Sequence, residues 1–93
     1  MRTIEQATAF KRDYKREAKG QHRATLQSDL KHIFVALVTD QVLDAKYRDH
    51  ELSGNWSGYR ECHIKPDLLL IYRKVNHDVL RLARLGSHSE LFG

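Results

Sequence analysis

Residues 59–85, which read YRECHIKPDLLLIYRKVNHDVLRLARL, contain the clearest secondary-structure pattern in this 93-residue chain. Apolar and polar positions alternate, as in β-strands with one buried face, and turn residues interrupt the pattern twice. The stretch that begins at Leu68 is apolar on both faces and therefore fits a central strand. The pattern predicts a meander of three antiparallel strands over residues 59–64, 68–75 and 79–85.

In the first of these strands, alternate side chains point to opposite faces of the sheet. We expect Cys62 and Ile64 to face the core, and Tyr59, Glu61 and His63 to face away from it. This separation argues against a nucleophilic pair of Cys62 and His63, because neighbouring residues of a strand diverge.

The N-terminal half has helical periodicity instead. Apolar residues at steps of three and four predict helices over residues 5–18 and 23–39, and Gly20 ends the first. Residues 2–4 could form a short first strand. With no repeat or Pro/Gly/Ser-rich linker, we predict one domain over residues 1–93, of the α+β class, in which a helical hairpin packs on a small antiparallel sheet.

The composition excludes several classes of protein. A single cysteine cannot form an internal disulfide, and the longest apolar run, residues 33–38, is far shorter than the ~18 residues of a membrane span. No apolar signal region follows the first residues, so we expect a cytoplasmic protein without a membrane partner. Sixteen Lys and Arg against twelve Asp and Glu give a net charge of +4, which favours an anionic partner.

The six histidines divide into two groups by position. His22 and His32 lie among charged residues of the helical hairpin and His77 lies in a turn, so we interpret these three as solvated surface side chains. The other three could gather along one exposed side of the sheet: His50, His63 and His88.

Asp67 follows His63 by four residues, across the turn at Pro66, and could return close to it. A cluster of imidazoles and a carboxylate suits either metal binding or general acid–base catalysis. Zinc motifs such as H-E-x-x-H or paired C-x-x-C are absent, so we expect no metal and no cofactor.

Acid–base cleavage of RNA fits these residue types. RNA supplies its own 2′-hydroxyl nucleophile, so the protein needs a base, an acid and a cation that stabilises charge on the phosphate. Histidine suits the first two roles because its pKa lies near neutral pH, and arginine suits the third because it can hold phosphate oxygens bidentately. Arg60, Arg81 and Arg84 lie in the sheet half and could do this, or could form salt bridges within the fold.

The aromatic residues allow two interpretations. Trp56 and Tyr59 could be hydrophobic anchors or platforms on which bases stack. Phe92, next to the C-terminus, could close the edge of the core or stack on a base.

Three segments resemble a known family: DHELSGNW at 49–56, GYRECHIKPD at 58–67 and RLGSHSELF at 84–92. They share the patterns D-H-x-L-x-G-x-W, Y-R-x-x-H-x-x-P-D and R-x-G-(S/T)-H-x-x-L-F with the YafQ branch of the RelE/ParE toxin superfamily. The resemblance covers the C-terminal half closely, and length and order of elements agree for the remainder.

The resemblance implies a RelE-like β-α-α-β-β-β toxin of a type II toxin–antitoxin pair. Such toxins enter the ribosomal A site and cut mRNA without a metal ion, leaving a 2′,3′-cyclic or 3′-phosphate and a 5′-hydroxyl. A cognate antitoxin neutralises the toxin, and their complex binds operator DNA and represses the operon.

The resemblance also implies roles for individual residues. Either His50 or His63 would be the base and His88 the acid, while Asp67 would orient His63 or transfer a proton itself. Phe92 also matches a functional position of the family.

For phosphate stabilisation we expect Arg84 first and Arg60 second. Leu68 stands where a member of this branch has Trp, which argues against base stacking at that position. The alternatives are a ParE-like toxin that inhibits DNA gyrase by protein binding, and a non-catalytic RNA-binding module.

Overall fold

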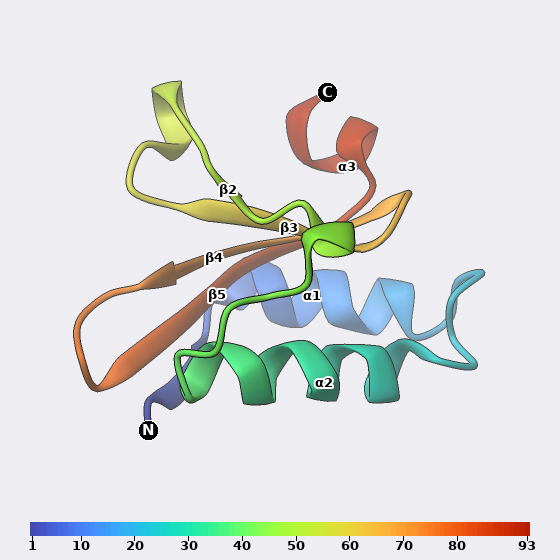
Figure 1. Cartoon of the computed structure of the whole chain (residues 1–93). Helices are drawn as coiled ribbons and strands as arrows, with labels where there is room; N and C mark the ends of the chain where they lie inside the picture. The colour runs from blue at the N-terminus through green and yellow to red at the C-terminus, as the bar shows by residue number, and fades with distance from the viewer.

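The computed structural model describes all 93 residues and places a helical hairpin on one face of a five-stranded sheet (Figure 1). A short C-terminal helix and the segment that contains β2 lie on the opposite face. The elements in chain order are β1 (Thr3–Gln6), α1 (Thr8–Glu17), α2 (Leu26–Val38), the 3₁₀-helix η1 (Ala45–Tyr47), β2 (His50–Glu51), the 3₁₀-helix η2 (Gly54–Trp56), β3 (Arg60–Lys65), β4 (Leu68–Lys74), β5 (Val79–Gly86) and α3 (His88–Phe92).

The order of strands in the sheet is β1-β5-β4-β3-β2. Strands β3, β4 and β5 form the predicted antiparallel meander. The prediction of a wholly antiparallel sheet is wrong at one edge, because β1 runs parallel to β5, with Ile4 opposite Leu80. The chain leaves β1 through the helical hairpin, so β1 is not held to the antiparallel pairing that a tight turn imposes.

Other differences lie at the ends of elements. Helix α1 begins at Thr8 rather than at Glu5, because Glu5 and Gln6 continue β1 and pair with β5. Helix α2 begins at Leu26 rather than at Arg23. Strand β2 and helix α3 were not predicted, since elements of two and five residues are too short to show a period.

The main core lies between the sheet and the hairpin. Cys62 and Ile64 face it, as their parity predicts, and Phe10, Leu30 and Ile33 meet them from the helices. Leu68 is also fully enclosed in this core, which excludes it from base stacking. Burial raises the pKa of the Cys62 thiol far above its ordinary value, so this cysteine is an inert core residue.

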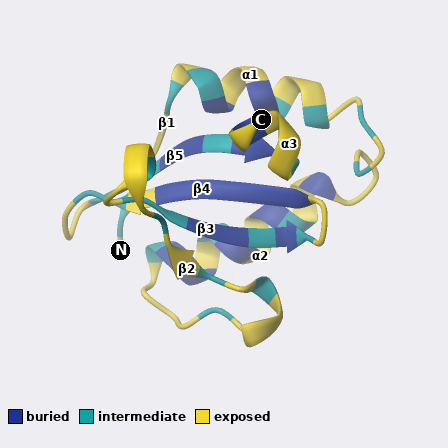
Figure 2. Cartoon of the chain, turned by 90° about the horizontal axis from the view of Figure 1, so that it is seen from above, coloured by how far each residue is buried: buried dark blue, intermediate teal, exposed yellow.

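A second, smaller apolar cluster covers the other face of the sheet. Strand β4 is buried from Leu68 to Tyr72, with both faces covered, as expected of a central strand (Figure 2). Trp56 and Tyr59 pack on this cluster, and their rings meet edge to face at 5.2 Å. Both are therefore hydrophobic anchors for the loop that contains η2. The cluster itself consists of Leu69, Ile71, Ala83 and Leu91.

Candidate active site

A hollow of about 580 Å³ opens on this second face of the sheet, between the segment that contains β2 and helix α3. It brings together residues that are up to 42 positions apart in the chain, among them His50 and His88, two of the three histidines expected at the site. Its lining consists of His50, Leu52, Ser53, Asn55, Trp56, Glu61, His88, Leu91 and Phe92.

His63, the third histidine expected at the site, does not line this hollow itself but contacts Glu61, which does. Strand β2 pairs with β3 so that His50 lies opposite Glu61. The Glu61 carboxylate reaches both imidazoles, with Oε1 3.2 Å from His63 Nε2 and Oε2 3.9 Å from His50 Nε2. The two histidine rings lie 6.4 Å apart. All three selected histidines therefore lie on the same side of the sheet.

A hydrogen bond assigns the proton of one of these rings. His50 Nδ1 lies 2.7 Å from the Arg48 carbonyl oxygen, which can only accept, so Nδ1 carries the proton and donates it. His63 turns Nε2 to the Glu61 carboxylate at 3.2 Å, and Nδ1 is left as the ring nitrogen without a partner in the fold. That nitrogen is the one available to a substrate.

Sequence reasoning missed Glu61 as a member of this site. Glu61 is 5% exposed, yet its carboxylate contacts imidazoles rather than a Lys or Arg. Strand parity contained the necessary information, because Glu61 precedes His63 by two residues and points to the same face. What parity could not show is that β2 brings His50 to the other carboxylate oxygen.

Helix α3 contributes His88, Leu91 and Phe92 to the hollow. Its first turn is closed by a capping box, in which Glu90 N donates to Ser87 Oγ and Ser87 N donates to Glu90 Oε1. This short helix sets His88 and Phe92 one turn apart, with ring centroids 5.0 Å from each other. Phe92 is 38% exposed and therefore free to contact a ligand beside His88.

Replacing Leu91 with Ala should release α3 from the sheet. Leu91 is the residue of α3 buried in the second cluster, and truncating a buried Leu costs about 2 kcal/mol or more. We expect faster amide hydrogen exchange over residues 88–93. The control is Val42→Ala, because Val42 is exposed. Unchanged exchange in the Leu91 variant would contradict this account of α3.

Asp67 does not approach His63, and that expectation is wrong. Its Oδ2 accepts a hydrogen bond from Gln21 Nε2 at 2.5 Å, and its Oδ1 lies 2.8 Å from His22 Nε2. The hydrogen bond from His22, more than any other contact, holds the pKa of Asp67 below its ordinary value. His22 is correspondingly not a solvated side chain. This contact ties the β3–β4 turn to the loop between α1 and α2.

The three selected arginines all form ion pairs within the fold. Arg84 holds Asp13, with Nε 2.7 Å from Oδ2, whereas Arg60 lies against Asp49 and Glu51 and Arg81 against Glu5. The salt-bridge alternative is thus confirmed for each. Arg84 keeps Nη1 outside these contacts and remains partly exposed.

Asp13 connects α1 to β5 through its carboxylate, and the residue is 3% exposed. It accepts hydrogen bonds from Arg84, from Arg16 and from the backbone N–H of Leu85. Burial acts to raise the pKa of Asp13, but these hydrogen bonds and the two guanidinium charges outweigh it, and the pKa lies below its ordinary value.

Two further properties concern ligands and membranes. No group of three or more His, Cys, Asp or Glu side chains is arranged to hold a metal ion. None of the helices combines the length and the apolar character needed to cross a membrane.

Comparison with known proteins places the chain among bacterial toxins. Residues 2–93 match the family model described as the bacterial toxin of type II toxin–antitoxin system, YafQ. The mRNA interferase toxin YafQ of Escherichia coli K12 is 39% identical over 93 residues, which cover 99% of this chain and 97% of that protein.

Solved structures agree over the same length. The toxin in the crystal structure of the E. coli DinJ-YafQ toxin–antitoxin complex superposes with a TM-score of 0.81 at 39% identity, covering 99% of this chain and 98% of that one. A metal-bound toxin from Helicobacter pylori also superposes with a TM-score of 0.81, at 43% identity, covering 99% and 100%. The sequence patterns, the RelE-like fold and the full-length matches lead to one conclusion: the chain belongs to the YafQ family of type II toxins.

Proposed function

We propose that this chain is a ribosome-dependent mRNA endonuclease of the cytoplasm that inhibits translation. The observation that carries the proposal is the Glu61 carboxylate between His50 and His63, beside a hollow that also contains His88. The name of the E. coli K12 relative, an mRNA interferase toxin, supports the same activity.

In the proposed reaction, His63 Nδ1 takes the proton of the RNA 2′-hydroxyl. The 2′-oxygen forms a bond to the phosphorus, the bond to the 5′-oxygen breaks, and His88 in its protonated form gives that oxygen a proton. The products are a 2′,3′-cyclic phosphate and a 5′-hydroxyl. Glu61 holds the ring of His63 in orientation and stabilises the imidazolium that forms, as a carboxylate does in a catalytic triad.

The remaining residues complete the proposed site. Arg84 would meet the phosphate through its free Nη1, while Arg60 and Arg81 would have to open their ion pairs to do so. Phe92 would stack on a base next to His88. We place Asp67 as a positioning residue, because its contacts with the α1–α2 loop hold the turn that follows His63.

Cleavage should proceed without a metal ion, since histidines and arginines can supply the base, the acid and the cation. We expect the rate to stay unchanged after treatment with EDTA, measured under conditions in which the ribosomes remain intact. A control without toxin verifies that integrity. Loss of cleavage with EDTA and its recovery on adding back a divalent metal would contradict this chemistry.

The proposed partners are the ribosome with its mRNA and a cognate antitoxin. The E. coli relative forms the DinJ-YafQ complex, which supports an antitoxin partner for this chain. Contact with operator DNA would occur only through the toxin–antitoxin complex.

Expression without the antitoxin tests the proposal against its rivals. The proposed function requires growth arrest, cleaved mRNA and relief by co-expressed antitoxin. DNA damage with intact mRNA would instead show a gyrase inhibitor. Salt-sensitive RNA binding with no cleavage product would show a binding module.

A further inference from the structure

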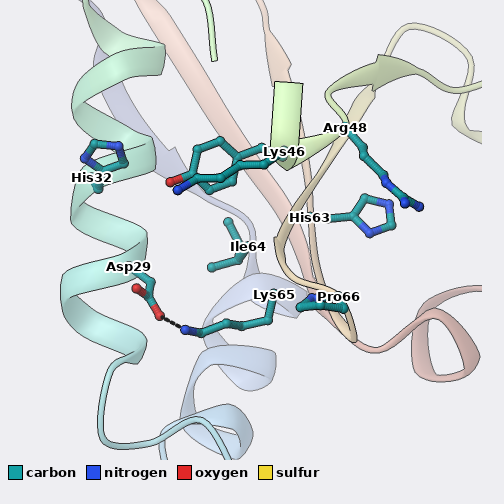
Figure 3. A pocket seen from close by; sticks show the side chains of 9 residues that line it. Asp29, His32, Lys46, Arg48, His63, Ile64, Lys65 and Pro66 are labelled. Carbon is teal, nitrogen blue, oxygen red and sulfur yellow. Dashed lines mark ion pairs between the residues drawn. The ribbon is translucent and has the colours of Figure 1, made fainter. Parts of the chain in front are cut away.

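A second hollow lies on the other side of His63, between α2, η1 and β3, and has a volume of about 480 Å³ (Figure 3). We call it the basic hollow. His63 lines this hollow and also contacts Glu61, which lines the first. The two hollows are thus joined through this pair. The charged and imidazole side chains of the basic hollow are Asp29, His32, Lys46, Arg48, His63 and Lys65.

Positive charge in this hollow is not balanced. Asp29 is its one acidic side chain, and Asp29 Oδ2 lies 3.0 Å from Lys65 Nζ. Lys46 has no carboxylate partner, and its ammonium lies 5.2 Å from the centre of the Tyr47 ring. Arg48 is exposed and forms no ion pair, in contrast to Arg60, Arg81 and Arg84.

The backbone conformation of Arg48 places its carbonyl oxygen next to His50. Arg48 ends η1 with a φ of 51°, in the left-handed region that costs a side-chain-bearing residue roughly 1 kcal/mol or more. In this conformation its carbonyl oxygen accepts the hydrogen bond of His50 Nδ1. Its side chain and that of His63 both line the basic hollow, on the side away from α2 (Figure 3).

From these contacts we infer that the basic hollow binds a backbone phosphate of the RNA next to the one that is cleaved. Arg48 is the principal contact, because its guanidinium lies on the side of His63, whereas the ammonium of Lys46 points toward α2 (Figure 3). A guanidinium has five donors in a planar fork and can hold two phosphate oxygens, and that of Arg48 gives up no internal ion pair to do so. The inference rests on the proposed cleavage of RNA at His63 and adds the substrate contact that positions the strand there.

The test compares the binding of a short 2′-O-methyl RNA of mixed sequence, which cannot be cleaved because its 2′-oxygens are blocked. Fluorescence anisotropy with the complete chain gives the dissociation constant over a series of KCl concentrations. For Arg48→Gln we expect binding about tenfold weaker, as loss of a charged hydrogen bond predicts. The slope of log K against log [KCl] should become shallower by about 0.7, the value for one phosphate contact on a single strand.

Two variants sharpen this test. Arg48→Lys keeps the charge and should keep the slope, while losing part of the affinity. Arg12→Gln is the matched control, because Arg12 is exposed on α1, forms no ion pair and lies outside both hollows. Unfolding midpoints confirm that each variant folds.

Equal binding by Arg48→Gln and Arg12→Gln would overturn the inference. His63→Ala separates this outcome from failure of the proposed function, since it should lose cleavage whether or not Arg48 binds a phosphate. If His63→Ala still cleaves while Arg48→Gln binds RNA weakly, the phosphate site stands and the histidine chemistry fails.

Discussion

His63→Ala and His88→Ala should each lower the rate of mRNA cleavage by a factor of about 10² to 10⁴, the usual contribution of a general base or acid. Both variants should still fold, because neither side chain belongs to either apolar cluster, although His63→Ala lowers the free energy of unfolding by removing a contact of the buried Glu61 carboxylate. Single-turnover cleavage on programmed ribosomes measures the first quantity, and urea unfolding measures the second.

His77→Ala is the matched control for both variants. His77 is exposed in the turn between β4 and β5 and lies outside both hollows, so its replacement should leave the rate at the wild-type value. The assignment fails for any histidine whose Ala variant cleaves as fast as His77→Ala.

Asp13→Asn should produce the largest loss of stability among the substitutions considered. An amide at position 13 carries no charge, so Arg84 and Arg16 lose the carboxylate with which both form ion pairs. Removing one partner of a buried ion pair costs about 3 kcal/mol or more. We expect this loss in the free energy of urea unfolding at neutral pH. Asp78→Asn, in an exposed turn, should cost far less.

Acidification should reduce the difference in the free energy of unfolding between the wild type and Asp13→Asn. The pKa of Asp13 is lower in the folded chain than in the unfolded one, so its contribution is complete above the unfolded value of about 3.9. That contribution disappears as pH falls through the folded pKa. Urea unfolding at successive pH values measures the gap, and a gap that stays constant below about pH 4 would contradict the ion-pair account.

The sequence predicts what depends on local periodicity. The meander, the central position of β4 and the separation of Cys62 from His63 all follow from alternation along strands. Parity also places Glu61 and His63 on one face, which is the geometry that the site uses.

Contacts between distant segments could not be predicted in this way. Asp67 binds Gln21 and His22, which lie in a loop more than 40 residues earlier. Arg84 binds Asp13, which lies 71 residues earlier. Several carboxylates are plausible partners for each charged group, and only the packing of α1 and α2 against the sheet selects one. The parallel pairing of β1 with β5 could not be predicted either, because it depends on how the helical hairpin packs against the sheet.

Mapping the 5′ ends of mRNA fragments after induction of the toxin compares the intact site with one that lacks the proposed acid. The account predicts regularly phased, codon-specific ends in cells that express the wild-type chain, and their disappearance with His88→Ala at equal protein levels. Wild-type cells without such ends, or the same ends at equal yield with His88→Ala, would contradict it.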